Sequence, residues 1–318
     1  MSSPTLVSGS RPVRSADNWP ELKWYQWVEA SWLPAPEPVE ALSDRFAGYL
    51  QGYSTFADEP ETFSEWLRML PLAALGTPVR NYRGEIVVPG DDEHLAAVVA
   101  IDIGSGDIQR STDVILRLQA EWRWYREEFR MLFLTDEKTE LPLLKWGDGE
   151  RVVSVGGQPK WVRKAEPQVK IDYPHFRDYL DSVFAWSDSP ALLAESDSLA
   201  PDRLEPGAFF LHQGPPAEVL VVIDVASSSS GDRQMLLAQA LNPAENIHVI
   251  RPSRATPWFP VRTDQPVVVP RVKPYSWNEL RRMKQLRTRP EVNCIGELCP
   301  KAQRSSRKPA LPPRSVRR

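Results

Sequence analysis

The longest helical pattern in the chain covers residues 106 to 129. Apolar residues recur there at spacings of seven, three and four, which places them on one face of a helix: Ile108, Ile115, Leu118 and Trp122. Asp107 precedes the pattern and is expected to cap the helix. Ser111 falls on the same apolar stripe, where a small hydroxyl side chain is commonly a packing residue. The pattern predicts a long, half-buried central helix.

Two shorter segments also have helical periodicity. In residues 62 to 71, Thr62 and Glu65 have the spacing of a capping box, and Pro71 ends the pattern. Residues 176 to 186, FRDYLDSVFAW, form a second amphipathic segment. We expect a helix in each.

Strand patterns dominate the second half of the chain. Residues 219 to 226 are almost entirely aliphatic, and the polar loop SSSSGD separates them from residues 233 to 239, so we predict an antiparallel hairpin. Shorter strands are expected at residues 96 to 103, 208 to 211 and 247 to 250. Helices that precede a run of antiparallel strands indicate an α+β fold, with helices packed on an antiparallel sheet.

Charge is distributed unevenly along the 318 residues, although the net charge is only -3. Residues 271 to 318 contain 14 Lys and Arg against 3 Asp and Glu, a net charge of +11, so the rest of the chain carries -14. The hydrophobic content of 42% is that of an ordinary globular protein, so a core of substantial size is expected.

These patterns divide the chain into three parts. Residues 1 to 41 are expected to form an N-terminal extension with a short, Trp-rich amphipathic helix at residues 19 to 32. Residues 42 to 262 form the α+β domain, and residues 263 to 318 form a basic, largely disordered tail. No apolar run is long enough for a signal sequence or a membrane span, so we expect a cytoplasmic protein without a membrane partner.

Metal and cofactor motifs are absent from the sequence. Cys294 and Cys299 lack the further ligands of a zinc site and are interpreted as free thiols, with a local disulfide as the alternative. The four histidines are scattered, without the spacing of a metal motif. An alternative is that His212, Glu218 and His248 meet across neighbouring strands. We expect no metal and no cofactor.

Several sequence blocks occur in the order of an uncharacterised bacterial family, the domain of unknown function 4846. The blocks are ETFSEWLRMLPL, the strand ending in AIDIG, DIQRSTDVILRLQAEWRWY, FRDYLDSVF, LEPGAFFL, the predicted hairpin, and LLAQALNPAENIHVI followed by PWF. The chain resembles this family from about Leu42 to Val261.

That family in turn resembles papain-like hydrolases of the NlpC or CHAP type. In such folds a cysteine at a helix start is the nucleophile, a histidine heads a later strand, and a polar residue on the neighbouring strand orients the histidine. The family typically reads QCAD at the helix and PGHAV at the strand. The resemblance implies that Ser111 replaces the cysteine, that Glu218 replaces the histidine, and that Gln239 retains the polar position.

The resemblance also marks two further positions. Glu245 in AQALNPAE stands where the family commonly has Gln in AQSYMPAQ, and His248 matches the family. The implied binding cleft therefore consists of Ser111, Glu218, Gln239, Glu245 and His248. Glu218 would lie where this cleft opens to water, because a charge elsewhere on a core strand would be desolvated.

Both groups that perform nucleophilic chemistry are replaced. We therefore expect a catalytically degenerate member of a papain-like, hydrolase-related family, acting as a binding or structural protein with an unknown protein or peptide partner. One alternative is an active hydrolase with an altered Ser111/Glu218 dyad, although a free carboxylate with a pKa of about 4.3 is a poor base for a hydroxyl. The other is a nucleic-acid-associated protein that binds weakly through its basic tail.

Overall fold

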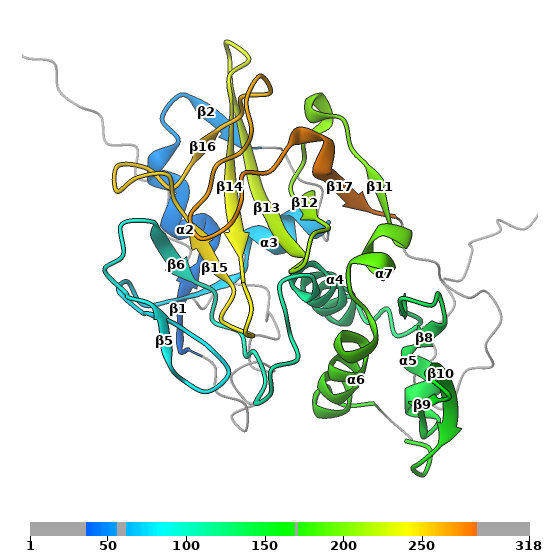
Figure 1. The fold of residues 1–318 in the computed structure, drawn as a ribbon. Helices are drawn as coiled ribbons and strands as arrows, with labels where there is room; N and C mark the ends of the chain where they lie inside the picture. Colours follow the sequence, from blue (N-terminus) through cyan, green and yellow to red (C-terminus); the bar gives the residue numbers. More distant parts are fainter. Residues whose placement is uncertain (1–35, 56–61, 169–170, 285–318) are drawn as a thin grey trace, which may run out of the picture.

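Nine of the described strands form one large antiparallel sheet, the others pair in two-stranded sheets, and helices pack against one face of the large sheet (Figure 1). The computed structural model of the chain describes residues 36–55, 62–168 and 171–284. The expected α+β class, with helices on an antiparallel sheet, is confirmed in this part of the chain.

The sheet has nine strands in the order β11-β17-β12-β13-β14-β15-β6, with β16 paired to β14 and β2 paired to β13. In chain order the strands are β2 (Tyr53–Thr55), β6 (Leu95–Val98), β11 (Ser196–Ser198), β12 (Phe209–His212), β13 (Glu218–Ser228), β14 (Arg233–Gln239), β15 (His248–Ile250), β16 (Phe259–Pro260) and β17 (Leu280–Met283).

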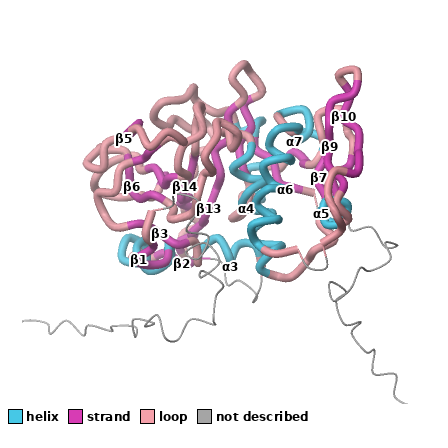
Figure 2. The backbone as a smooth tube through the Cα atoms, turned by 90° about the horizontal axis from the view of Figure 1, so that it is seen from below, coloured by secondary structure: helices cyan, strands magenta, loops and turns pink. Residues whose placement is uncertain are grey.

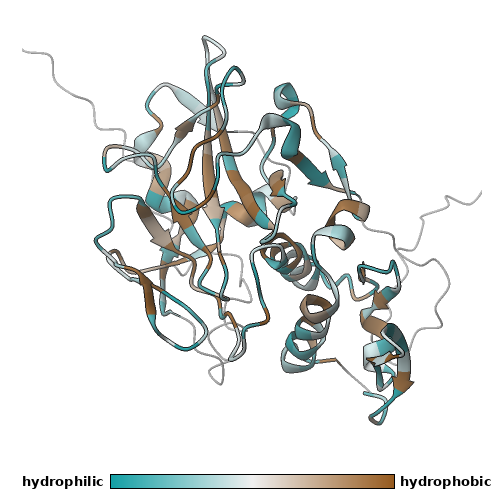
Figure 3. Cartoon of the chain, in the orientation of Figure 1, coloured by the Kyte–Doolittle hydropathy of each residue, from teal (hydrophilic) through white to brown (hydrophobic). Residues whose placement is uncertain are grey.

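The predicted hairpin forms the centre of the sheet. β13 and β14 pair from Val221 opposite Ala238 to Ser227 opposite Arg233, with a bulge between Val222 and Asp224. Figure 3 shows apolar residues along much of both strands. Because both faces of a central strand are covered, a continuous aliphatic run is stable here where an alternating pattern would not be.

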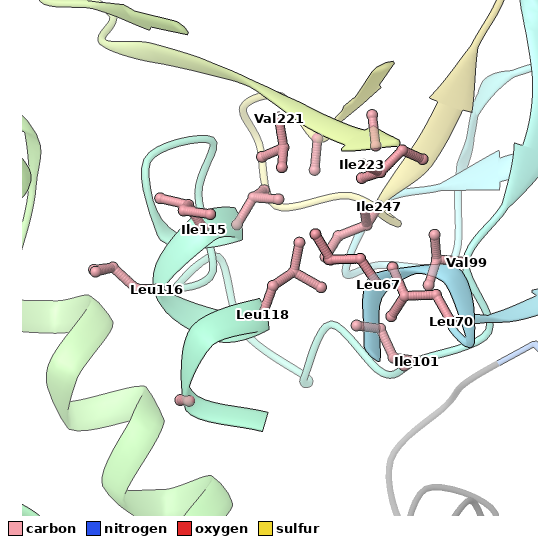
Figure 4. Close-up of a cluster of buried hydrophobic side chains, with 14 of the residues drawn as sticks. Leu67, Leu70, Val99, Ile101, Ile115, Leu116, Leu118, Val221, Ile223 and Ile247 are labelled. Atoms are coloured by element: carbon pink, nitrogen blue, oxygen red, sulfur yellow. The ribbon is translucent and has the colours of Figure 1, made fainter. Parts of the chain in front are cut away.

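Helix α4 (Asp113–Tyr125) packs across the hairpin. Figure 4 shows Ile115 and Leu118 of the helix directed toward Val221 and Ile223 of β13. The helix begins five residues later than the sequence predicts. Asp107 does not cap it, because the Asp107 carboxylate accepts a hydrogen bond from the backbone N–H of Ala244 at 2.8 Å, and Thr112 occupies the N-cap position.

The two other predicted helices are present. The Thr62 hydroxyl of α3 (Phe63–Arg68) accepts a hydrogen bond from the N–H of Glu65 at 3.3 Å, as the capping pattern predicts. Helix α6 (Tyr173–Trp186) starts three residues before the predicted segment, because Asp172 caps it by accepting the N–H of His175. Figure 2 shows α6 beside α4.

A buried ionic cluster joins α4 to α6. Asp102 accepts hydrogen bonds from Arg117 of α4 at 2.8 Å and from Arg177 of α6 at 2.9 Å. Glu121 accepts from Arg117 at 2.7 Å and from the hydroxyl of Tyr173 at 2.7 Å. Both arginine side chains are at most 1% exposed, so their buried positive charges are balanced mainly by the carboxylates of Asp102 and Glu121.

Residues 263 to 284 complete the second face of the sheet. The sequence assigns them to a largely disordered tail, but Tyr275 and Trp277 are buried against Phe210, and Leu280 begins the strand that pairs with β12. The folded domain therefore extends beyond residue 262, at least to Lys284.

The remaining elements lie around the sheet and its helices. They are β1 (Pro38–Ala41), α2 (Leu42–Phe46), the 3-10 helix η2 (Ala47–Tyr49), β3 (Pro71–Ala73), β4 (Val79–Arg80), β5 (Ile86–Val88), β7 (Leu132–Leu134), β8 (Glu140–Pro142), α5 (Leu143–Gly147), β9 (Glu150–Val155), β10 (Gln158–Arg163), α7 (Ser189–Ala194), and the 3-10 helices η3 (Pro201–Arg203) and η4 (Trp277–Glu279). Figure 2 shows the β9–β10 hairpin beyond α6, on the side away from the sheet.

Several sequence expectations concern residues outside the described ranges. These are the Trp-rich helix at residues 19 to 32, the two cysteines, and the tail beyond Lys284. Among the helices of the described residues, none has the length and apolar character that crossing a bilayer requires.

Candidate functional site

Ser111 lies in the turn that leads into α4, and its side chain is completely buried. Its hydroxyl oxygen accepts a hydrogen bond from the backbone N–H of Val219 at 3.0 Å. Its own N–H donates to the side-chain carbonyl of Asn242 at 3.3 Å. These two bonds tie the turn before α4 to the start of β13 and to the loop after β14.

Glu218 is the first residue of β13 and lies opposite His212 of β12. Side chains alternate along a strand, so Glu218 shares a face with Leu220, while Val219 is on the other face. Leu220 belongs to the apolar cluster that includes Tyr275, and Val219 belongs to the cluster under α4. The structure thus brings Ser111 and Glu218 to the same end of β13 but on opposite faces of the sheet.

The surroundings of Glu218 come from the C-terminal segment. Burial raises the pKa of the Glu218 carboxyl, and the positive charges of His212 and Lys273 act in the opposite direction. His212 Nδ1 lies 2.9 Å from a carboxylate oxygen of Glu279. The Tyr275 hydroxyl is buried and bonds to no group in the described ranges. Burial, followed by the charges of Glu218 and Glu279, raises the pKa of that hydroxyl.

Gln239 and His248 form a buried pair across β14 and β15. The Gln239 side-chain nitrogen lies 3.3 Å from His248 Nε2, and His248 Nδ1 lies 3.0 Å from the carbonyl oxygen of Asn246. An Nδ1–H that donates to this carbonyl leaves Nε2 as the acceptor for the Gln239 amide. Burial lowers the pKa of His248, although the charge of Glu245 opposes the shift, which favours the neutral ring.

Glu245 is also fully buried and has a structural set of partners. It accepts a hydrogen bond from the N–H of Leu241 at 3.0 Å and two from the Arg271 guanidinium, at 3.1 and 2.9 Å. Arg271 comes from the C-terminal segment, so this bidentate pair fixes that segment to the loop between β14 and β15.

The histidines do not converge on a metal site. His212 pairs with Glu279, whereas His248 pairs with Gln239, so the grouping of His212, Glu218 and His248 as metal ligands is not formed. Across residues 36–55, 62–168 and 171–284, no group of three or more His, Cys, Asp or Glu side chains has the arrangement that holds a metal ion.

A cleft with a volume of about 450 Å³ opens beside the turn that contains Ser111. Its lining comes from segments that are far apart in the sequence: Arg110 and Thr112, Asp136, residues 188 to 190 at the start of α7, residues 213 to 217, and Asn242. None of the five residues implied by the family resemblance is part of this lining. Ser111 lies directly behind it, between Arg110 and Thr112.

Hydrogen bonds from α7 hold the acidic wall of the cleft. One oxygen of Asp136 accepts the N–H groups of Asp188 and Ala191, at 2.8 and 3.1 Å. One oxygen of Asp188 accepts the N–H of Ser189 at 2.7 Å and the hydroxyl of Thr112 at 3.2 Å. The wall is therefore fixed to both α7 and the start of α4.

Residues 42–282 match the family model described as a domain of unknown function (4846). The chain belongs to the DUF4846 family. The DUF4846 match runs from α2 into β17, so it includes the C-terminal segment that covers the second face of the sheet up to residue 282. No match to the chain was found among curated proteins or among solved structures. The more remote papain-like relationship therefore stays a prediction.

Sequence reasoning did not identify the residues that line the cleft of this DUF4846 protein. Arg110 and Thr112 flank the predicted position, and the resemblance that pointed to Ser111 was the available signal for them. Asp136 and Asp188 lie in polar segments without periodicity, and they reach the cleft only because α7 is packed beside α4.

Proposed function

We propose that the protein is a non-catalytic member of a papain-like lineage and acts by binding a polypeptide partner in the cleft beside α4. The environment of Ser111 carries this proposal. A nucleophilic serine needs an exposed hydroxyl and a base, and a free backbone N–H at the helix start would stabilise the oxyanion. Here the hydroxyl accepts from Val219, the N–H donates to Asn242, and the side chain is 0% exposed.

The placement of Glu218 also argues against a dyad. A general base must come within hydrogen-bond reach of the hydroxyl proton. Glu218 lies on the opposite face of the sheet from the cluster under α4, with His212 and Lys273 near it. The raised pKa of Glu218 is thus a consequence of its partial burial, and it does not make Glu218 a general base for Ser111.

A gapless comparison gives a second position for the missing base. When the family sequence PGHAV is laid on residues 215 to 219, its histidine coincides with Ala217. Ala217 lines the cleft and shares a face with Val219. An alanine has no titratable group, so this comparison also favours a site that binds without turnover.

The cleft itself supports binding. Its volume of about 450 Å³ lies within the range of about 300 to 1,000 Å³ that is usual for small-molecule and cofactor sites. Polar and charged groups from α4 and α7 meet there on fixed backbone, and prolines 190, 215 and 216 stiffen its rim. A preorganised polar cleft of this size binds a short segment of a partner with little loss of protein conformational entropy.

The test compares turnover and binding in the same preparation. The wild type, Ser111→Ala and Glu218→Gln are incubated with peptide and ester substrates, and the proposal predicts equal background rates for all three. Binding is then measured on a peptide array with Ser189→Trp, which places a large side chain in the cleft. Ala185→Trp, at an exposed position of α6 outside the cleft, is the matched control.

Each outcome decides part of the proposal. Peptides that bind the wild type and the Ala185→Trp variant but not the Ser189→Trp variant support the cleft as the binding surface. Turnover by the wild type that both Ser111→Ala and Glu218→Gln abolish would overturn the non-catalytic reading and establish the altered dyad.

A further inference from the structure

Three charged side chains line the cleft, and they do not neutralise one another. Arg110 comes from the turn before α4, Asp136 from the turn between β7 and β8, and Asp188 from the N-cap position of α7. Within the described ranges, Arg110 makes no ion pair and no side-chain hydrogen bond, and neither aspartate has an ion pair. Opposite charges thus face the same space without closing on each other.

The two aspartates retain acceptor capacity. All the hydrogen bonds that fix the wall use one oxygen of each carboxylate, Oδ1. The Oδ2 atoms of Asp136 and Asp188 accept nothing from the described part of the chain. Since a carboxylate has about four acceptor positions, each side chain can still bind a donor such as an ammonium group.

A third carboxyl, that of Asp113, lies behind the cleft wall. Asp113 is 1% exposed, its Oδ2 accepts the backbone N–H of Arg110 at 2.8 Å, and its Oδ1 has no partner in the described residues. Burial raises the pKa of Asp113 well above its usual value. The charges of Asp188 and Asp136 add to this shift, whereas the hydrogen bond from the Arg110 N–H and the charge of Arg110 oppose it. Within the described residues Asp113 forms no ion pair with the Arg110 guanidinium, which therefore stays available to a ligand in the cleft.

The cleft also lies at the N-terminal end of α4, a helix of thirteen residues. The helix dipole favours a negative ligand group at this end, on the side where Arg110 stands. Arg110 therefore stands at the start of α4, while Asp188 caps α7 and Asp136 accepts two N–H groups at the start of α7.

We propose that the cleft binds a short peptide by its two free termini. The peptide's terminal carboxylate pairs with Arg110, and its terminal ammonium group pairs with Asp136 and Asp188. This inference rests on the proposed function, because it names the chemistry of the ligand for the same cleft. A ligand with both charges pairs with Arg110 and with the two aspartates at once. An anion or a cation alone would leave one of these charged groups desolvated and unpaired.

The test is a chemical double-mutant cycle measured by isothermal titration calorimetry on the full chain. The ligands are trialanine, N-acetyl-trialanine and trialanine amide, so that each terminal charge is removed separately. The protein variants are Arg110→Gln, the double variant Asp136→Asn/Asp188→Asn, and Lys160→Gln. Asparagine keeps the Oδ1 acceptor that fixes the wall, and Lys160 is an exposed cation outside the cleft.

We expect blocking either terminus to weaken binding to the wild type by about tenfold or more, because each removes a charge-assisted hydrogen bond. In Arg110→Gln, trialanine and its amide should bind equally, while N-acetylation still weakens binding. In the double aspartate variant, N-acetylation should have no effect. The Lys160→Gln variant should behave as the wild type, and thermal unfolding of each variant checks its fold.

Two outcomes overturn the inference. If blocked and unblocked trialanine bind the wild type equally, or if none of the three binds, the termini are not what the cleft recognises. The binding role would survive either result if array peptides still bind in a way that Ser189→Trp abolishes. Hydrolysis dependent on Ser111 would instead remove the proposed function itself.

Discussion

Replacing Asp102 by asparagine tests how the helical layer is held together. Asp102 bonds to Arg117 and Arg177 through both carboxylate oxygens and also accepts the N–H of Gly104 at 3.1 Å. Asparagine keeps the shape but offers a single oxygen, and its NH₂ group then faces a guanidinium. Two buried arginines would retain only Glu121 and the partly exposed Asp181 as acidic partners.

The expected loss is large because the partners remain buried. Removing one member of a buried ion pair costs about 3 to 5 kcal/mol, since the other charge is left uncompensated. A domain of this size loses about 2 to 4 °C in Tm for each kcal/mol. Asp102→Asn should therefore unfold roughly 6 to 20 °C below the wild type.

The same carboxylate predicts a dependence on pH. Burial alone would raise the pKa of Asp102, but the charges and hydrogen bonds of Arg117 and Arg177 hold it well below its usual range. The stabilisation is therefore complete above the unfolded pKa of about 3.9 and is lost as the pH falls below that value.

Urea unfolding followed by circular dichroism between pH 3 and pH 7 measures both effects. Asp264→Asn, at an exposed position, is the control. Asp102→Asn should be less stable than the control at neutral pH and should lose less on acidification. If Asp102→Asn and Asp264→Asn differ by less than about 1 kcal/mol in free energy of unfolding at pH 7, the reasoning is refuted, because an exposed ion pair contributes no more than that.

Three further predictions concern buried polar groups. Ser111→Ala leaves the N–H of Val219 without its partner and should cost about 1 to 3 kcal/mol in urea titrations. Burial raises the pKa of Glu195 to about 8, so the free energy of unfolding of the wild type should fall by up to about 5 kcal/mol as the pH rises from about 5 to 8. Glu195→Gln should remove this pH dependence. If the stability of the variant falls with pH in parallel with that of the wild type, the prediction is contradicted. Arg271→Ala leaves the Glu245 carboxylate buried and unpaired and should cost about 2 to 4 kcal/mol, with Arg254→Ala as the surface comparison.

The elements that the sequence predicts well are those whose burial is set locally. In α4 and in the β13–β14 hairpin, the spacing of the apolar residues along the sequence is enough to place them toward the core. The start of α4 was predicted wrongly, because the Asp107 carboxylate accepts a hydrogen bond from the N–H of Ala244, a residue that is 137 positions away. A local capping rule has no access to such a competitor.

The C-terminal segment shows the limit of composition. Residues 263 to 284 are rich in proline and basic side chains, which favours a disordered tail. Val267, Tyr275 and Trp277 are nevertheless buried, because the second face of the sheet has apolar side chains such as Phe210 that need cover. That requirement belongs to strands 40 to 70 residues earlier and is not visible within the segment.

The site residues that the resemblance implies stay a prediction. The structure places Ser111 in the turn before α4, bonded to the start of β13, and Glu218 as the first residue of β13. Their opposite faces follow from the pleat of β13, and a continuous aliphatic run does not show which face is which. The cleft lining was missed because Asp136 and Asp188 become neighbours of α4 only through α7.

The central claim is that Ser111 is a structural residue behind a binding cleft. Its most direct test is intact-protein mass spectrometry after incubation of the folded protein with a serine-reactive fluorophosphonate. The account predicts no adduct at Ser111 and therefore identical mass changes in the wild type and in Ser111→Ala. A stoichiometric adduct on the wild type that Ser111→Ala eliminates would contradict it.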